Sequence, residues 1–300
     1  MNIGLLVVFL LGITWTGAGI TVTSARRNNC SIRKFYFIGS LWASILLGIY
    51  LFISGGTGDF TVTKLPAIMM LAAGSLINGI GQATIMLNLK SGGCAFVYAI
   101  PQLGFIIPFL YSGIFWGEQI TVLNLLGIIT VAIAILLVVP GRQPESEKSP
   151  EFRRIMIALT AMLMLGVSQI FVLFPSLPQN AAIKISPITS SFIIMMTTTV
   201  CFAILIPVSR SNHKIEIRKL LRYCFLWGSF AAASALILFW AFRLMSLHGQ
   251  AGVVFPIACS SEIIIYTVFT RVKLKEKLNA RQLISLTAII LGIFMIKFRS

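Results

Sequence analysis

Ten apolar segments alternate with short polar connectors along almost the whole chain. We predict membrane-spanning helices over residues 2–23, 35–53, 65–89, 94–115, 120–139, 155–174, 186–208, 223–245, 250–269 and 282–298. A bilayer core of about 30 Å requires roughly 20 apolar residues per helix, so ten such helices occupy nearly all of the 300 residues. The pattern therefore predicts an all-α integral membrane protein with no room for a soluble catalytic domain.

A single polar stretch divides the chain into two halves. Residues 140–154 combine several prolines with charges of both signs, and we predict that they form a cytoplasmic linker between 1–139 and 155–300. An offset of 158 residues aligns spans three to five with spans eight to ten without a gap, and it places Glu118 on Glu276. Because few aligned residues are identical, we expect a repeat of architecture, with five helices in each half.

The basic residues follow this division. Nineteen of the 24 Lys and Arg residues lie in odd-numbered connectors. Basic connectors stay on the cytoplasmic side during insertion, so both termini are expected outside. Five spans precede the linker, so the second half runs in the opposite sense to the first. This arrangement is typical of inverted-repeat transporters.

Composition narrows the class of protein further. The chain is 57% hydrophobic and 11% charged, whereas soluble domains carry about 25% charged residues. The net charge of +16 comes from loop anchors rather than a nucleic-acid-binding patch, and it suits anionic lipid headgroups. Five cysteines without a C-x-x-C pair predict neither a disulfide nor a metal, and no cofactor is expected. Arg26 and Arg27 follow the first apolar run, so we expect no cleaved signal peptide, and a bacterial plasma membrane suits the chain.

The last span of each half carries a family resemblance. The segments GEQITVLNLLGIITVAIAILLVV, from Gly117, and KEKLNARQLISLTAIILGIFMIKF, from Lys275, resemble the end-of-repeat pattern of the drug/metabolite transporter superfamily. A Glu precedes a capping residue and a glycine-punctuated apolar helix. RKFYFIGSLW, from Arg33, is similar to the second span of sugar–proton symporters of the rhamnose and glucose/ribose type. The resemblance implies alternating access about a midplane site, with spans five and ten peripheral.

Glu262 is the main candidate for chemistry. It is the only one of eight acidic residues near the middle of a span, and a carboxylate there costs at least ~2.5 kcal/mol on insertion scales. We therefore predict that it couples protons or binds substrate. Cys259 and Tyr266 share its helical face, and Tyr266 is a candidate hydrogen-bond donor. The alternative is a protonated structural carboxyl bonded to a neighbouring helix.

Amides and aromatic rings on other spans are candidate substrate contacts. Asn78 and Gln82 lie with Ser75 on one face of span three, either lining a pathway or holding helices together. Tyr98 and Gln102 face together on span four. Pro101 there and Pro256 on span nine predict interrupted helices at corresponding places in the two halves, and packing kinks are the alternative.

Five further residues complete the set. Trp15 in span one and Gln169 in span six lie on equivalent helices of the two halves and are candidates for lining a central cavity. Arg243, near the outward end of span eight, either snorkels to the interface or is a charge partner for Glu262 or for an anionic substrate. Glu118 and Glu276 are interpreted as helix-start residues favoured by the helix dipole.

These patterns favour a secondary-active transporter, not an enzyme, that moves a small polar metabolite. A sugar or related neutral solute is preferred, with proton coupling. Export of amino acids or drug-like compounds is the alternative within transport, and a lipid scramblase or membrane enzyme is a less favoured one. The expected partners are a small-molecule substrate and the bilayer, with no nucleic acid. The sequence leaves a homodimer open.

Overall fold

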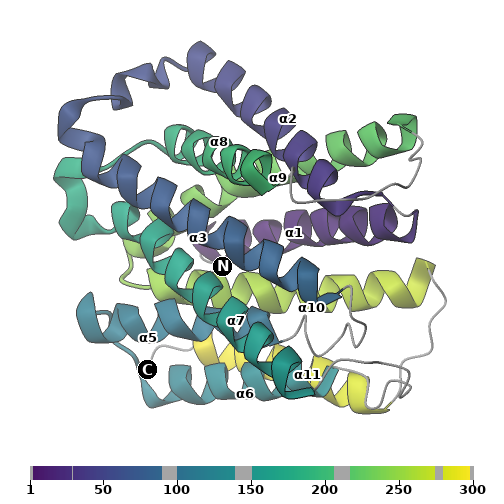
Figure 1. The fold of residues 1–300 in the computed structure, drawn as a ribbon. Coiled ribbons are helices and arrows are strands. Elements are labelled where there is room, and N and C mark those ends of the chain that lie inside the picture. The colour runs from purple at the N-terminus through teal and green to yellow at the C-terminus, as the bar shows by residue number, and fades with distance from the viewer. Residues whose placement is uncertain are drawn as a thin grey trace. The chain divides into compact units, whose positions relative to one another are not determined.

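Helices account for all the regular structure of the described part of the chain. The structure is a computed structural model that describes residues 3–28, 30–89, 100–138, 151–205, 217–273 and 280–297, and these ranges contain α- and 3-10 helices but no strand (Figure 1). Seven of the helices are long and apolar enough to cross a membrane, and three shorter apolar ones cover Ile100–Phe115, Val122–Leu137 and Ala280–Ile296. The prediction of an all-helical chain is confirmed, and its helices are compatible with a multi-pass membrane protein.

The chain folds into two compact units, and each combines helices from both predicted halves. The first unit contains Met1–Gly79 and Phe171–His248, and the second contains Ile80–Ile170 and Gly249–Ser300. Helices α3 (Leu65–Leu89) and α7 (Glu151–Leu173) each contribute to both units. The division into halves at 140–154 stays a prediction, because interleaved repeats are compatible with such units.

In the first unit, α2 packs against both α8 and α9, and α1 lies along α9. The bounds are α1 Ile3–Arg27, α2 Ile32–Ile53, α8 Pro187–Leu205 and α9 Ile217–Ser246, with 3-10 turns η1 Gly56–Asp59, η2 Val62–Lys64, η4 Phe174–Ser176 and η5 Pro178–Ile183. Glycines set the closest approach. A Cβ atom on Gly39 would lie 2.6 Å from the ring of Trp227 and 3.3 Å from the carbonyl oxygen of Cys224. A larger residue at Gly39 would therefore separate α2 from α9.

In the second unit, α6 and α11 run alongside each other, and α10 contacts α5, α6 and α11 (Figure 1). The bounds are η3 Leu103–Phe105, α5 Ile106–Phe115, α6 Val122–Val138, η6 Ala251–Val253, α10 Val254–Lys273 and α11 Ala280–Lys297. Asn124 of α6 donates from Nδ2 to the carbonyl oxygen of Ile296 at 2.7 Å. This bond satisfies a carbonyl in the last turn of α11, which has no partner within its own helix.

The helix bounds correct the expected connectors. The sequence pattern predicts a connector over residues 209–222. In the structure, the first turns of the 30-residue helix α9 contain Arg218, Lys219 and Arg222. Such a helix is about 45 Å long, longer than the hydrocarbon core of about 30 Å. Lys and Arg are good helix formers, so the helix continues beyond its apolar part, and the basic residues occupy the extension.

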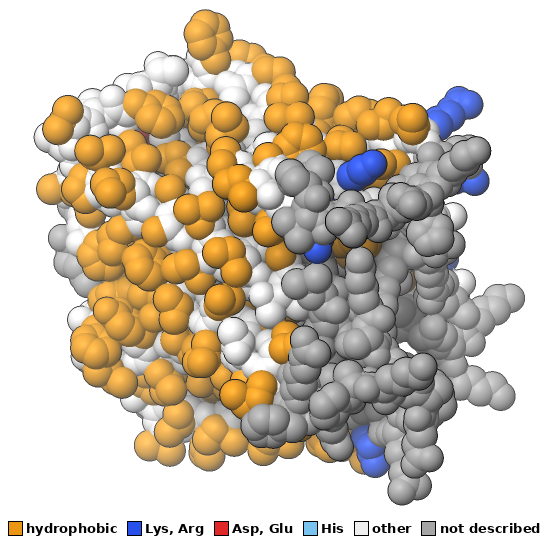
Figure 2. All heavy atoms as spheres, in the orientation of Figure 1, with side chains coloured by type: hydrophobic (Ala, Val, Ile, Leu, Met, Phe, Trp, Pro, Cys, Tyr) orange, Lys and Arg blue, Asp and Glu red, His pale blue; other side chains and the backbone are white. Residues whose placement is uncertain are grey.

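Outward-facing side chains are largely apolar. Many large hydrophobic residues are more than a third exposed, among them Phe52, Met69, Ile114 and Ile204. Figure 2 shows hydrophobic side chains over most of the described surface on the face it presents. Soluble monomers rarely expose contiguous apolar areas of this extent, so this surface is suited to lipid.

Candidate functional site

The predicted site residues fall into both units. Trp15, Asn78 and Arg243 belong to the first unit. The second unit holds the larger group, which consists of Gln82, Gln102, Gln169, Glu262 and Tyr266. Tyr98, like Glu276, lies outside the described residues. The candidate site is therefore built from the second unit, where a carboxylate and three amides occur together.

A 3-10 turn in span four follows Gln102. Residues 100–102 are helical, the turn covers Leu103–Phe105, and α5 begins at Ile106. Pro108 favours this local tightening, because it has no N–H to donate to the carbonyl group of Gly104 and its ring crowds that carbonyl. A Cβ atom on Gly166 of α7 would lie 2.7 Å from the Gly104 carbonyl oxygen, so this carbonyl faces α7. The described part of span four is thus one helical run, Ile100–Phe115, tightened at Leu103–Phe105, and the expected interruption at Pro101 stays a prediction.

Span nine differs from span four in this respect. Pro256 lies in the first turn of α10, which is preceded by the 3-10 turn η6. A proline in the first turn leaves the rest of the helix intact. The two prolines thus act differently. In place of a pair of equivalent interruptions, the described residues show a 3-10 turn inside span four and a 3-10 entry into α10.

Gln102 and α10 are in direct contact. The Cys259 thiol, buried in α10, donates to Oε1 of Gln102 at 3.9 Å. A thiol is a weak donor, so this bond orients the amide rather than holding the helices together. With Oε1 engaged, the NH₂ group of Gln102 is the part of the amide that can donate to a ligand.

Glu262 follows Cys259 by one turn, on the same face of α10, and Tyr266 follows Glu262 by another turn. Both side chains are partly buried. The structure describes the side chains of three acidic residues, Asp59, Glu118 and Glu262. Of these, only Glu262 lies inside a helix long enough to cross a membrane. The position of Glu262 within an apolar helix therefore supports a role in binding protons or substrate that Asp59 and Glu118 do not have.

Two more amides lie near the crossing of α3, α5 and α7. A Cβ atom on Gly81 would lie 3.2 Å from Leu165, and one on Gly104 would lie 3.4 Å from the same side chain. Gln82 follows Gly81, and Gln169 lies one turn beyond Leu165 on α7. Leu165 therefore connects the helical segments that carry Gln82, Gln102 and Gln169.

Gln169 has a polar atom that the described residues do not satisfy. Its Oε1 atom is buried, and the described part of the chain places no hydrogen-bond donor on it. A buried acceptor without a donor costs about 1–3 kcal/mol. A hydroxyl or N–H group from a bound solute, or from water, would remove this cost.

In the first unit, several predicted polar residues hold helices together or bond within their own helix. Ser75 of α3 donates to the carbonyl oxygen of Ile194 at 2.8 Å and lies 2.9 Å from the Thr198 hydroxyl. The hydroxyls of Thr14 and Thr16 bond to carbonyls of α1 itself. Asn78 and Trp15 are partly buried. For Ser75, helix association is the interpretation that the contacts favour.

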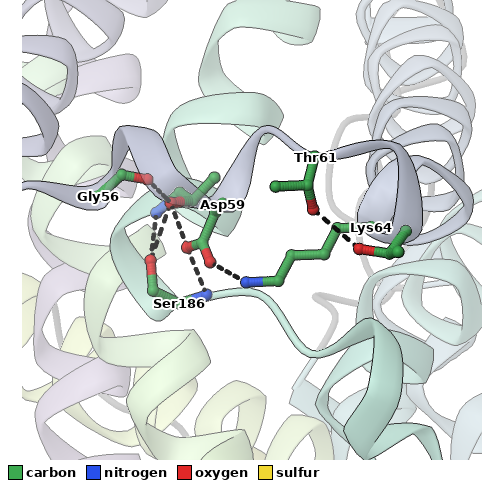
Figure 3. A network of polar contacts seen from close by, with 7 residues as sticks. Gly56, Asp59, Thr61, Lys64 and Ser186 are labelled. Carbon is green, nitrogen blue, oxygen red and sulfur yellow. Dashed lines mark hydrogen bonds and ion pairs between the residues drawn. The ribbon is translucent and has the colours of Figure 1, made fainter.

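Asp59 caps a helix from the other half of the sequence (Figure 3). Its Oδ2 accepts the backbone N–H of Ser186 at 2.9 Å and the Thr189 hydroxyl at 2.8 Å, at the start of α8, and Lys64 forms an ion pair with Oδ1. Partial burial alone would raise the pKa of Asp59. The hydrogen bonds from Lys64, Ser186 and Thr189 outweigh this effect and lower the pKa to about 2. Asp59 is therefore a charged structural residue at neutral pH.

We expect Asp59→Ala to lower the free energy of unfolding of the purified protein by about 1–2 kcal/mol, because a helix cap is lost. The carboxylate stabilises the folded chain above its ordinary pKa near 3.8, and this contribution disappears as the pH falls toward 2. The difference between wild type and variant should be constant from pH 8 to pH 5. Lys64→Ala, which removes only the ion pair, should cost less. A difference that changes between pH 8 and pH 5 would contradict this assignment.

Glu118 has a similar structural role in the second unit. Its two carboxylate oxygens accept the backbone N–H groups of Ala251 and Gly252 at 2.7 and 2.9 Å. These groups belong to η6, immediately before α10. Glu118 was interpreted as the start residue of its own following helix, but the contacts place it at the start of a helix more than 130 residues later in the sequence. Nothing in the linear sequence indicated this pairing.

Comparison with known proteins identifies a fold and no family. No family model matches the chain, and no curated protein matches it. A solved chain described only as the crystal structure of a protein is similar, with a TM-score of 0.73 and 13% identity, over 99% of this chain and 98% of that chain. A likeness at this identity shows the fold alone. The same helical fold thus occurs in a solved protein.

Proposed function

We propose that this protein is a secondary-active transporter that moves a small polar metabolite by alternating access, coupled to protons. The observation that carries the proposal is Glu262, an ionisable group within an apolar helix, one turn from the contact between Cys259 and Gln102. Ionisable residues inside membrane spans usually mark ion or substrate pathways. The transported solute is a sugar or a related neutral compound, since amides offer both donors and acceptors to hydroxyl groups.

The proposal includes ten spans in a five-plus-five inverted repeat of the drug/metabolite transporter type. Packing within the units supports it, because α2 packs on α8 and α6 packs on α11. In each pair a span contacts its own counterpart in the other half, as is expected of equivalent helices that lie close to a two-fold axis. Four buried positions of α6 recur 158 residues later as buried positions of α11, namely Gly127 and Ser285, Val131 and Ile289, Ala134 and Gly292, and Ile135 and Ile293.

An exporter of amino acids or drug-like compounds is the second candidate, because the same amides also suit those solutes. A membrane enzyme is less well supported, since it would need further catalytic groups beside Glu262. The other two carboxylates with described side chains, Asp59 and Glu118, already serve as helix caps. A scramblase would need a polar groove open to lipid.

A counterflow screen tests the function. Proteoliposomes containing the purified chain are loaded with one unlabelled solute at a time, from sugars, polyols and amino acids, and uptake of the labelled solute is followed. We expect transient accumulation of at least one polar solute above that in protein-free liposomes. Absence of exchange for all classes, together with lipid scrambling by the same preparation, would reject the proposal.

The topology is tested separately. We expect a reporter that is active only in the cytoplasm to be silent when fused after Ser300, because an even number of spans would place both termini outside. The same reporter inserted within residues 140–154 should be active. An active C-terminal fusion would contradict the predicted outside location of the C-terminus while leaving the counterflow result intact.

A further inference from the structure

A small polar cavity lies at one end of α9, within the first unit. Its volume is about 260 Å³, and it is lined by Ser176, Lys184, Ile185, Ser186, Pro187, Phe239 and Arg243. Small-molecule pockets usually measure about 300–1,000 Å³. This cavity is therefore suited to a compact polar group rather than to a whole drug-sized solute.

The charges of the lining are positive. Lys184 and Arg243 contribute an ammonium and a guanidinium group, and none of the described residues that line the cavity is acidic. Asp59 contacts the lining residue Ser186, and this carboxylate is already paired with Lys64. The described residues give neither Lys184 nor Arg243 an ion-pair partner. Two cations thus face one cavity with no described counter-charge.

The hydrogen-bonding capacity of the lining suits a phosphate group. Guanidinium groups bind phosphate through parallel N–H bonds, and an ammonium group adds a point charge. Ser176 also lines the cavity, whereas the hydroxyl of Ser186 is already bonded to Thr189. The start of α8 is not counted here, because Asp59 already accepts the Ser186 N–H.

A neighbouring Trp residue favours a position of this cavity near headgroup depth. Trp240 precedes Arg243 by three residues on α9 and is 56% exposed. Exposed Trp residues gather where hydrocarbon meets water. Phe239 and Pro187 give the cavity an apolar wall, which suits the glycerol and upper acyl carbons of a lipid.

We propose that the cavity between Lys184 and Arg243 binds a phosphate group, supplied by an anionic lipid headgroup. The site shares no residue with the amides and carboxylate of the second unit. It does not depend on the transport proposal, and a failed counterflow screen would leave it untouched. Free phosphate has the same chemistry, and the experiment below separates the two sources.

The test uses the full-length chain in detergent and measures its thermal midpoint with three additives: phosphatidylglycerol, diacylglycerol and inorganic phosphate. Ligands that bind the folded state raise the midpoint. Phosphatidylglycerol should raise it for the wild type, whereas diacylglycerol, with the same chains but no phosphate, should not. The concentration of phosphatidylglycerol needed for a given rise in the midpoint should increase at least about threefold in Lys184→Gln and in Arg243→Gln. In the double variant it should increase about tenfold.

Arg222→Gln is the matched control, since it removes the same charge from the opposite end of α9, and it should respond like the wild type. Native mass spectrometry of retained phosphatidylglycerol gives a second readout if a variant is unstable. A response to inorganic phosphate that needs both cations, without a lipid response, would retain the phosphate site but assign it to the free ion. An unchanged lipid response in the double variant, or an equal effect of diacylglycerol, would overturn the proposal.

Discussion

Glu262→Gln is expected to abolish solute accumulation driven by a pH gradient while leaving counterflow within a few-fold of the wild type. Glutamine retains the size and hydrogen-bonding groups of the side chain but cannot release a proton. If one proton accompanies each solute, a gradient of one pH unit supports about tenfold accumulation, because a factor of ten corresponds to 1.4 kcal/mol. The variant should instead equilibrate its solute at a ratio of about one.

Glu118→Gln provides the matched control for this experiment. It makes the same change from carboxylate to amide, in the same unit, at a residue that caps η6. We expect this variant to be less stable yet still coupled to the pH gradient. Retained accumulation in Glu262→Gln, or lost coupling in Glu118→Gln with intact counterflow, would place the coupling group elsewhere.

Gly127→Leu and Gly292→Leu are expected to destabilise the second unit by at least about 2 kcal/mol each, and to lower the thermal midpoint by several degrees. The two glycines allow α6 and α11 to approach through their backbones. A Cβ atom on Gly127 would lie 2.8 Å from the carbonyl oxygen of Gly292, and one on Gly292 would lie 2.9 Å from that of Gly127. A backbone carbonyl cannot move aside as a flexible side chain can, so the helices would separate.

Thermal unfolding of the purified chain in detergent checks this expectation. Gly58→Ala is the control, because no atom lies within 4 Å of a Cβ placed there, and the midpoint should hardly change. Loss of the Asn124 bond to Ile296 should accompany the separation. If either leucine variant has the same thermal midpoint as the wild type, the close crossing of α6 and α11 is wrong.

Much of the helical fold could be predicted from hydrophobic pattern, because a spanning helix needs about 20 apolar residues whatever it packs against. The ends of the helices were less predictable. Basic residues such as Arg218 and Arg222 resemble connector residues, but they continue α9 beyond its apolar part. The interleaving of the halves into two units was also not predictable, since it depends on contacts between distant helices.

The candidate site was predictable where a residue conflicts with its apolar surroundings. Glu262 is conspicuous in sequence for this reason, and Pro108 explains the 3-10 turn that follows Gln102. Polar residues in polar connectors do not stand out in the sequence in this way. Asp59 and Lys184 are ordinary connector residues in sequence, and their roles arise only when η1, η5 and α9 meet the start of α8.

Solute-dependent proton movement tests the central claim most directly. Proteoliposomes containing the wild-type chain are filled with a pH-sensitive dye, and a solute identified by counterflow is added outside without an imposed pH gradient. We predict a change in lumenal pH that follows solute entry and is absent in Glu262→Gln. Solute entry with no change in lumenal pH, or an equal change in the variant, would contradict coupling through Glu262.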